Sequence, residues 1–594
     1  LGITAKMVVG RFSNFLSNCL RKKDLTSDMM RKDLNRCLGL SDLTFLSIGG
    51  MIGSGLYVLT GTVAHNFAGG SIVLSYLFAA IASALSAFCY AEFAARIPVT
   101  GSAYQFTYLS VGEFWAFVIG WNVLLEHAVS VSAVAKSLSG YFDSLIGFKM
   151  KEYLVVHTPM PGGILASYPD FFAAGIVIIV TIIVATGVKF TSRFTTILAA
   201  VNLAILVLIF STGMYLANIN NWTTVRGGFF PHGFAGTISG ASTLVFSYVG
   251  YEIVASVTEE AKNPNRDVPL ALLISICVAA LAYVGASAAL TLMVPWYDIV
   301  ISAPFPAAYA QRGWNWAKYV VSIGALAAMS TSIVTALVVV PRYVYAMASD
   351  GLIMPWFNTV NKTTGTPVIA TVTTGIFCIV MALVFSLHSL VEFISIGQLL
   401  ACSFVSFCVI KLRYEPNDAA THDNGTELQK VRPPSDTTIP NSTSMADSVV
   451  SPTDSLNDHC GIIKDSIMTS PFGEYFAWTL NFRPGVLPFY SLLLATLFGS
   501  VVSIMLLVGI SHIKEAWFIL LLVVFIFLSL FFLFFICMFT QDQTIKTYKV
   551  PFVPIIPFAS IMVNIILMLK LQKLTWLRLA IWMAIGNLYA YYLY

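Results

Sequence analysis

Long apolar stretches separated by short polar ones dominate the pattern along this chain. Stretches of roughly 18–25 mostly apolar residues recur from Leu43 to the C-terminal end, and each is long enough to cross a bilayer as a helix. One long polar stretch separates the last four from the others. The pattern predicts about fourteen membrane spans, at residues 42–66, 71–95, 112–142, 170–188, 194–218, 236–258, 269–295, 318–346, 368–386, 391–413, 487–510, 515–540, 549–569 and 574–594.

The composition agrees with an all-α integral membrane protein. Of the 594 residues, 57% are hydrophobic and 10% are charged, whereas soluble domains carry about 25% charged residues. The net charge of +4 comes from basic segments predicted to be cytosolic, so nucleic acid is not an expected partner. Residues 1–40 contain Arg21-Lys22-Lys23 and no uninterrupted apolar core, so we expect a cytosolic basic arm and no cleavable signal peptide.

The polar stretch divides the predicted organisation into four parts. Residues 414–485 are rich in Ser, Thr, Pro and Asp, cannot bury a core, and are predicted to form a disordered cytosolic linker. Residues 41–413 before it form the predicted ten-helix core, and residues 486–594 supply four additional spans. Within the linker, Asp458-x-x-x-Ile462-Ile463 is either a sorting signal or a chance match.

The positions of the nine cysteines and of one glycosylation motif predict which modifications occur on the outer face. None of the cysteines falls in a predicted external loop, and their spacings match no metal site, so we expect no external disulfide, metal or cofactor. Asn221-Trp-Thr223 is an acceptor motif in a predicted external loop, which predicts a glycan at Asn221.

Two spans at corresponding places in the two halves of the core are interrupted by glycine. The first contains Gly49-Gly50-Met-Ile52-Gly53-Ser54-Gly55, and the second contains Phe246-Ser247-Tyr248-Val249-Gly250. An intramembrane break survives only where protein, water or ligand satisfies its backbone groups. Packing between helices is the alternative explanation of small residues. A matched pair of breaks favours a substrate site, with Phe246 and Tyr248 as its walls.

Carboxylates inside spans are costly and suggest function. Glu126 lies in mid-span, where it can bind a cationic side chain, carry a coupling proton, or pair with a neighbour such as His127 or Lys136. Glu252 opens the half-helix after the second break, where an acidic residue stabilises a helix N-terminus. Glu92, near the inner end of its span, is a gate or a structural contact.

At these residues the chain resembles the cationic amino acid transporter family of the amino acid–polyamine–organocation superfamily. The match extends over the motifs Gly101-Ser-Ala-Tyr104, Gly120-Trp-Asn122, Thr258-Glu-Glu-Ala-Lys-Asn-Pro-Asn-Arg-Asp-Val-Pro269, Pro341-Arg-Tyr-Val-Tyr-Ala-Met-Ala-Ser-Asp-Gly351, Ser395-Ile-Gly397 and Trp576…Ile581-Trp-Met583. The resemblance implies two inverted five-helix repeats, 41–218 and 236–413, with broken first and sixth helices and four further helices. It also implies alternating access.

The resemblance also assigns the substrate contacts. The amides of Gly53-Ser54-Gly55 hold the substrate carboxylate, and carbonyls around Phe246-Ser247-Tyr248 hold its amino group. The implied substrate-binding set is Gly50, Ile52, Gly53, Ser54, Gly55, Glu126, Phe246, Ser247 and Tyr248.

One position departs from the family pattern. Many carriers of cationic amino acids have a lysine in the fifth span where we align Thr196, at the place where related carriers bind sodium. With Thr196 in place of that lysine and with Glu126 present, the chain is more similar to the family's fourth, orphan-like type and to its lysosome-associated members. The loop 143–169 has no cysteine, so no disulfide-linked heavy subunit is expected.

The resulting hypothesis is a secondary transporter, not an enzyme, in the plasma membrane or alternatively a lysosomal or endosomal membrane. Its expected partners are membrane lipids and an amino-acid substrate, with arginine, lysine or ornithine first. The alternatives are a carrier of neutral amino acids or γ-aminobutyrate, and a sensor that binds amino acids with little flux.

Overall fold

A computed structural model describes most of the predicted spans. The described residues are 21–23, 36, 38–97, 101–161, 163–185, 187–224, 227–301, 303–361, 366–415, 460–464, 479, 482–509, 512, 515–543, 547–571 and 573–593. Most of the predicted N-terminal arm and linker therefore lies outside the described residues, and so does Asp458.

The described residues form helices and no strand, which confirms the all-α fold. The first half of the core comprises α2 (Leu40–Met51), α3 (Ser54–Tyr57), α4 (Leu59–Val63), α5 (Ile72–Arg96), α7 (Glu113–Leu145), α9 (Phe171–Ala185) and α10 (Val188–Tyr215). The second half comprises α12 (Gly233–Leu244), the 3-10 turn η3 (Val245–Tyr248), α13 (Ile253–Ser256), α14 (Pro264–Met293), α16 (Asn315–Ser349), α17 (Val368–Val384) and α18 (Leu387–Tyr414). The last part comprises α23 (Val486–Val508), α24 (Ala516–Cys537), α25 (Ile555–Leu569) and α26 (Lys573–Leu593).

Fewer helices than predicted are long and apolar enough to cross a membrane by themselves in the described structure. In the described parts of the chain, nine helices are long and apolar enough to cross a membrane by themselves. The predicted spans at 170–188 and 368–386 appear as shorter apolar helices, and α25 and α26 meet at a 109° bend. The count of about fourteen is not confirmed, because apolar stretches that look continuous in sequence are shortened or bent in the fold.

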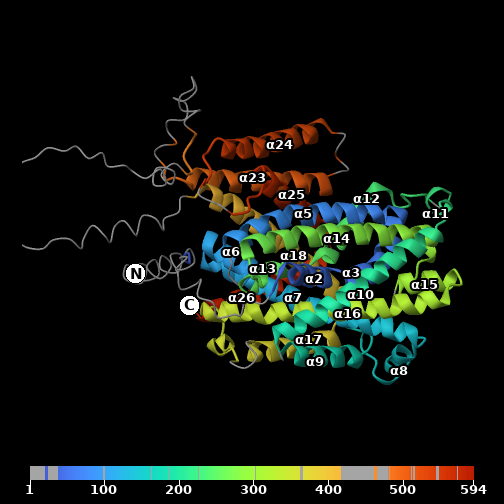
Figure 1. Cartoon of the computed structure of the whole chain (residues 1–594). Coiled ribbons are helices and arrows are strands. Elements are labelled where there is room, and N and C mark those ends of the chain that lie inside the picture. The colour runs from blue at the N-terminus through green and yellow to red at the C-terminus, as the bar shows by residue number, and fades with distance from the viewer. Residues whose placement is uncertain are drawn as a thin grey trace, which may run out of the picture.

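Helices at equivalent positions of the two halves pack against each other. The pairs are α5 with α14, α7 with α16, and α9 with α17, and Figure 1 shows α5 beside α14 and α9 beside α17. Two repeats related by a two-fold axis would produce this pairing, although the repeat boundaries themselves stay a prediction. The pairing surrounds the broken helices, so both breaks lie in the centre of the core.

Three of the last four helices, α23, α24 and α25, attach to one side of this core, whereas α26 packs on α7 and α18. Helix α25 packs on α5 and α18, while α23 packs between α25 and the outermost helix α24 (Figure 1). Leu520 and Phe527 on α24 are each 66% exposed. A helix with apolar side chains on its exposed face is suited to contact with lipid.

Three consecutive basic residues of the N-terminal arm bind the end of the core that carries the short helix α6 (Ser102–Ser110). Arg21 pairs with Glu113 at 3.0 Å, Lys23 pairs with Asp350 at 2.5 Å, and Lys22 pairs with Glu415. The acidic partners belong to the start of α7 and the ends of α16 and α18. This part of the arm therefore ties three core helices together at the predicted cytosolic end.

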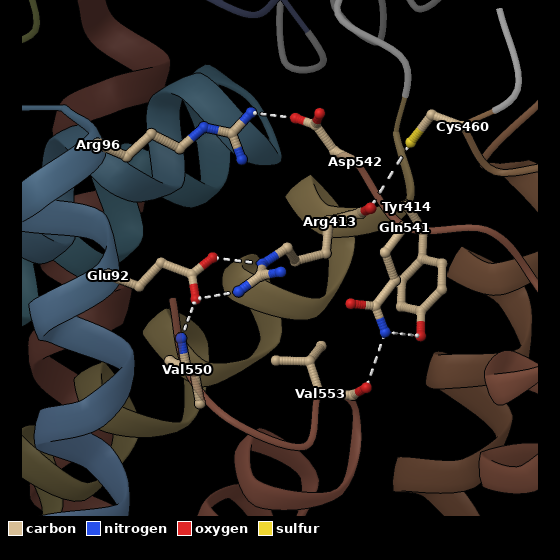
Figure 2. Close-up of polar contacts among 9 residues, drawn as sticks. All are labelled: Glu92, Arg96, Arg413, Tyr414, Cys460, Gln541, Asp542, Val550 and Val553. Atoms are coloured by element: carbon tan, nitrogen blue, oxygen red, sulfur yellow. Dashed lines mark hydrogen bonds and ion pairs between the residues drawn. The ribbon is translucent and has the colours of Figure 1, made fainter. Parts of the chain in front are cut away.

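A second set of ion pairs at this end joins the core to the last four helices (Figure 2). The Arg413 guanidinium on α18 donates to both carboxylate oxygens of Glu92 on α5, at 2.6 and 2.9 Å, and the Val550 N–H donates to Glu92 at 2.7 Å. Arg96 pairs with Asp542 at 3.2 Å. Glu92 is therefore a structural contact, as one of its two sequence interpretations proposed.

A short described piece of the linker packs beside these pairs. The Cys460 thiol donates to the Arg413 carbonyl at 3.6 Å, and burial raises the pKa of this thiol to about 12 (Figure 2). Ile463 is 2% exposed and pairs with Phe539 in a β-bridge. A sorting receptor would need Ile463 to be accessible, and in this conformation that side chain is buried.

Candidate functional site

The first break interrupts the broken helix between α2, which ends at Met51, and α3, which begins at Ser54. Carbonyl groups around the break accept hydrogen bonds from side chains of three other helices. Those donors are Ser332 of α16, Tyr283 of α14 and Asn202 of α10, which bond to the carbonyls of Gly49, Met51 and Ile52 at 2.9, 2.8 and 3.3 Å. The protein therefore satisfies the carbonyls of this break with neutral donors.

The second break follows η3 and is held by its own carboxylate. Gly250 has φ of +130°, which favours glycine, and its N–H lies 3.0 Å from each carboxylate oxygen of Glu252. The Gln398 amide donates to Glu252 at 3.3 Å. Glu252 thus stabilises the break itself, through the N–H of a residue that precedes it.

The two breaks are in direct contact. A Cβ atom added to Gly55 would lie 2.6 Å from Ser247 Cα, and one added to Gly250 would lie 2.8 Å from the Gly50 carbonyl carbon. The Tyr283 hydroxyl lies 2.6 Å from the Ser247 carbonyl oxygen and 2.8 Å from that of Met51, so it bridges both breaks.

The structure thereby gathers much of the predicted substrate-binding set. Gly50 and Gly55 contact the second break, while a Cβ added to Gly53 would meet the Ser332 hydroxyl at 2.1 Å. Ile52 is buried. The side chain of Ser54 lies outside the described residues.

A cavity of about 860 Å³ opens on one side of the breaks. It is lined by α4, α7, α12 and α18, by the segments 65–67 and 299–301, and by Lys570 and Leu571. Ligand pockets are commonly about 300–1,000 Å³, so an amino acid fits easily. The lining residues include Phe246, next to the contact between the breaks.

The second predicted wall residue does not line this cavity. The Tyr248 side chain is fully buried, and its hydroxyl donates to the Tyr76 carbonyl at 3.1 Å. Tyr248 therefore does not line this cavity in the described conformation, and its role as a second aromatic wall stays a prediction. Adjacent residues of a 3-10 turn project in different directions, which the sequence pattern could not resolve.

Glu126 is 1% exposed, and neither of its carboxylate oxygens has a hydrogen-bond partner. The Lys136 ammonium instead donates to the Ala382 carbonyl at 2.9 Å, so the suggested pair of Glu126 with Lys136 does not form. His127 Nδ1 lies 3.9 Å from Glu126 Oε1, beyond hydrogen-bond distance. Glu126 lies behind the breaks and does not line the large cavity.

Two neighbouring threonines of α10 differ in their contact with the first break, while the alignment of Thr196 with the family's lysine stays a prediction. Thr196 is half-buried, whereas Thr195 is 1% exposed, and a Cβ added to Gly49 would lie 3.0 Å from its methyl carbon. Thr195 is therefore the α10 threonine that contacts the first break.

Sequence reasoning missed Tyr283 and Asn202 as supports of the breaks. Both are polar residues within long apolar stretches, and such residues usually find a hydrogen-bond partner when buried. This signal marks them as important without revealing which helix they contact.

The packing of Asn221 disfavours the glycan that the sequence motif predicts. The residue is 7% exposed, and its side-chain amide donates to the Leu292 carbonyl at 2.6 Å. A glycan on this nitrogen would have to displace that packing, so we expect glycosidase treatment to leave electrophoretic migration unchanged. A glycosidase-sensitive shift that disappears in Asn221→Gln would instead establish the glycan.

Comparisons with known proteins agree with this architecture. The family described as amino acid permease matches residues 38–434, and the C-terminus of that family matches residues 548–594. Mouse cationic amino acid transporter 4 is 39% identical over 604 residues, covering 98% of this chain and 91% of the relative. The human protein of that name is also 39% identical, covering 95% and 88%. The Arabidopsis thaliana protein named cationic amino acid transporter 2, vacuolar, is 31% identical, covering 99% and 94%. The chain is therefore a multi-pass membrane protein of the amino acid permease family, in its cationic amino acid transporter branch, a family of transporters and not of enzymes.

Proposed function

We propose that this protein is a secondary carrier that moves amino acids across a membrane by alternating access, cationic ones first. The substrate binds where the large cavity reaches Phe246, next to the contact between the two breaks. Its carboxylate approaches the amides of Gly53, Ser54 and Gly55, and its amino group approaches the carbonyls next to Phe246. In the described conformation the Gly53 N–H donates to the Met51 carbonyl at 3.0 Å, so the carboxylate would have to replace that acceptor.

The observation that carries this proposal is the difference between the two ends of the core. At the predicted outer end, the cavity of about 860 Å³ reaches Phe246 of the second break. At the other end, the ion pairs Arg21–Glu113, Lys23–Asp350 and Arg342–Glu260 hold the helices together. A carrier that is open on one side and closed on the other has this arrangement, and transport requires the opposite arrangement to form as well.

The carbonyls proposed for the amino group retain capacity for a ligand. The Ser247 carbonyl accepts the Tyr283 hydroxyl, but a carbonyl oxygen has two lone pairs and can accept a second donor. A substrate ammonium can therefore bind there without removing the bridge between the breaks.

The test is uptake of radiolabelled arginine, lysine, ornithine, alanine and γ-aminobutyrate into proteoliposomes containing the purified protein. We expect saturable uptake of arginine, lysine and ornithine, because the named relatives are cationic amino acid transporters. Binding of these solutes without uptake would support the sensor hypothesis instead. Immunofluorescence would decide between the plasma membrane and a lysosomal or endosomal membrane.

The cavity favours neutral amino acids as the second candidate. Its described lining includes two ammonium groups, those of Lys136 and Lys570, and no carboxylate. Positive charge in a cleft repels cations and lowers their local concentration. Preferential uptake of alanine or γ-aminobutyrate in the same panel would select this candidate.

A further inference from the structure

Three buried ionisable side chains form a cluster behind the two breaks. Glu126 and His127 come from α7, and Glu252 comes from the second break. One oxygen or nitrogen atom of each lies within 4.8 Å of the others, and each residue is at most 3% exposed. Holding the second break requires only Glu252, and it does not explain why Glu126 and His127 share this interior.

The imidazole lies between the two carboxylates. His127 Nδ1 is 3.9 Å from Glu126 Oε1, and His127 Nε2 is 3.9 Å from Glu252 Oε1. Hydrogen bonds of this kind form near 2.7–3.2 Å, so a displacement of about 1 Å on each side would connect all three groups. The three groups are therefore aligned for proton transfer but lie slightly too far apart for hydrogen bonding.

The polar atoms of the cluster are unequally satisfied. Both Glu126 oxygens and His127 Nε2 lack hydrogen-bond partners, whereas Glu252 accepts from the Gly250 N–H and from Gln398. A buried carboxylate without donors is costly as an anion and much less so as a neutral acid. The surroundings therefore accommodate a negative charge on Glu252 and a proton on Glu126.

Neighbouring helices supply no charge to balance the cluster. The other titratable groups that face it in the described structure are Tyr90, Tyr251, Tyr343 and Cys402, from α5, the second break, α16 and α18. These side chains are neutral at pH 7 at their ordinary pKa values. A proton is thus the positive charge best suited to this site.

We propose that Glu126, His127 and Glu252 form a proton relay that couples proton movement to the second break, an inference that rests on the proposed carrier function. The Glu126 carboxyl group gives its proton to His127 Nδ1, while His127 Nε2–H gives its proton to Glu252 Oε1. One proton moves in total: Glu126 becomes the carboxylate, Glu252 becomes the neutral acid, and the imidazole changes tautomer.

The transfer changes the group that holds the second break. Hydrogen bonds to a charged acceptor are about twice as strong as neutral ones, so protonation of Glu252 weakens its hold on the Gly250 N–H. Gly250 packs directly on the Gly50 backbone. Loosening of Gly250 therefore loosens the contact between the two breaks, where the substrate is proposed to bind.

A small cavity connects the relay to the first break. It has a volume of about 20 Å³, and its lining includes Gly50, Ser130, Ser332, His127 and Glu252. This space is sufficient for about one water molecule, with hydroxyl and imidazole groups as partners. A single water there provides a path for the proton between Glu252 and the first break.

The test uses wild-type protein and His127→Gln in proteoliposomes, with the membrane potential clamped at zero and a pH-sensitive dye inside. In the wild type, we expect arginine or alanine uptake to acidify the interior, and a gradient of about one pH unit to drive about tenfold accumulation if one proton accompanies each amino acid. His127→Gln should lose this accumulation and retain exchange of internal for external amino acid within about twofold, because glutamine cannot relay a proton. His157→Gln is the matched control, since His157 is exposed on α8 (Lys149–His157).

The possible results distinguish failure of the relay proposal from failure of the proposed carrier function. Amino-acid uptake that is independent of pH in the wild type, or driven only by a sodium gradient, overturns the relay and leaves the carrier intact. Full pH-driven accumulation in His127→Gln also overturns the relay. If that variant does not fold, His127→Asn replaces it with the same expected loss, because asparagine cannot relay a proton either. Absence of any amino-acid uptake by the wild type overturns both proposals.

Discussion

Gly55→Leu is expected to abolish amino-acid uptake and to destabilise the protein. Even the first added carbon would lie 2.6–2.8 Å from three atoms of Ser247, one of them the backbone Cα. Carbon atoms in favourable contact are about 3.5–4.0 Å apart, so the two breaks must separate. Separation also lengthens the hydrogen bonds from the Tyr283 hydroxyl to the carbonyls of Met51 and Ser247. Overpacking of this kind typically costs about 1–3 kcal/mol.

The measurement is uptake and thermal stability of purified Gly55→Leu, alongside surface expression. Gly175→Leu on α9 is the control, because an added Cβ there meets nothing within 4 Å. We expect that control to transport like the wild type. Wild-type substrate affinity in Gly55→Leu would mean that the breaks only pack helices and do not bind the substrate.

Arg413→Met is expected to cause the largest loss of stability among single changes at the inner end. The Arg413 and Glu92 side chains are 5% and 4% exposed and share two hydrogen bonds (Figure 2). Removing one partner of a buried pair leaves an uncompensated charge and costs about 3–5 kcal/mol. Thermal unfolding in detergent should therefore show a clear decrease in Tm.

Two further variants identify the cause of that decrease. The double variant Glu92→Gln with Arg413→Met removes the uncompensated carboxylate, so part of the stability should return. Arg193→Met removes an exposed positive charge and should change stability by no more than about 0.5 kcal/mol. A Tm for Arg413→Met equal to that of the Arg193→Met control would show that the buried pair contributes nothing.

The sequence alone determined the fold class, the position of both breaks and the family. Apolar stretches of sufficient length must lie in lipid or in a core. Glycine-rich runs such as Gly53-Ser54-Gly55 weaken a helix and favour a break. These are local properties of the chain, so they can be read without knowing its neighbours. The count of about fourteen spans stays unconfirmed, because the length and bending of the shorter helices depend on what packs beside them.

Only the tertiary structure decided which polar residues meet. In spans that are apolar on every side, periodicity does not show which face is buried, so it could not distinguish Thr195 from Thr196. Nor could it place Tyr283 across both breaks or direct Lys136 away from Glu126. His127 is next to Glu126 in sequence, but its position beside Glu252 arises from two helices of different halves packing together. Contacts between distant segments are set by the packing of whole helices, which no single stretch of sequence specifies.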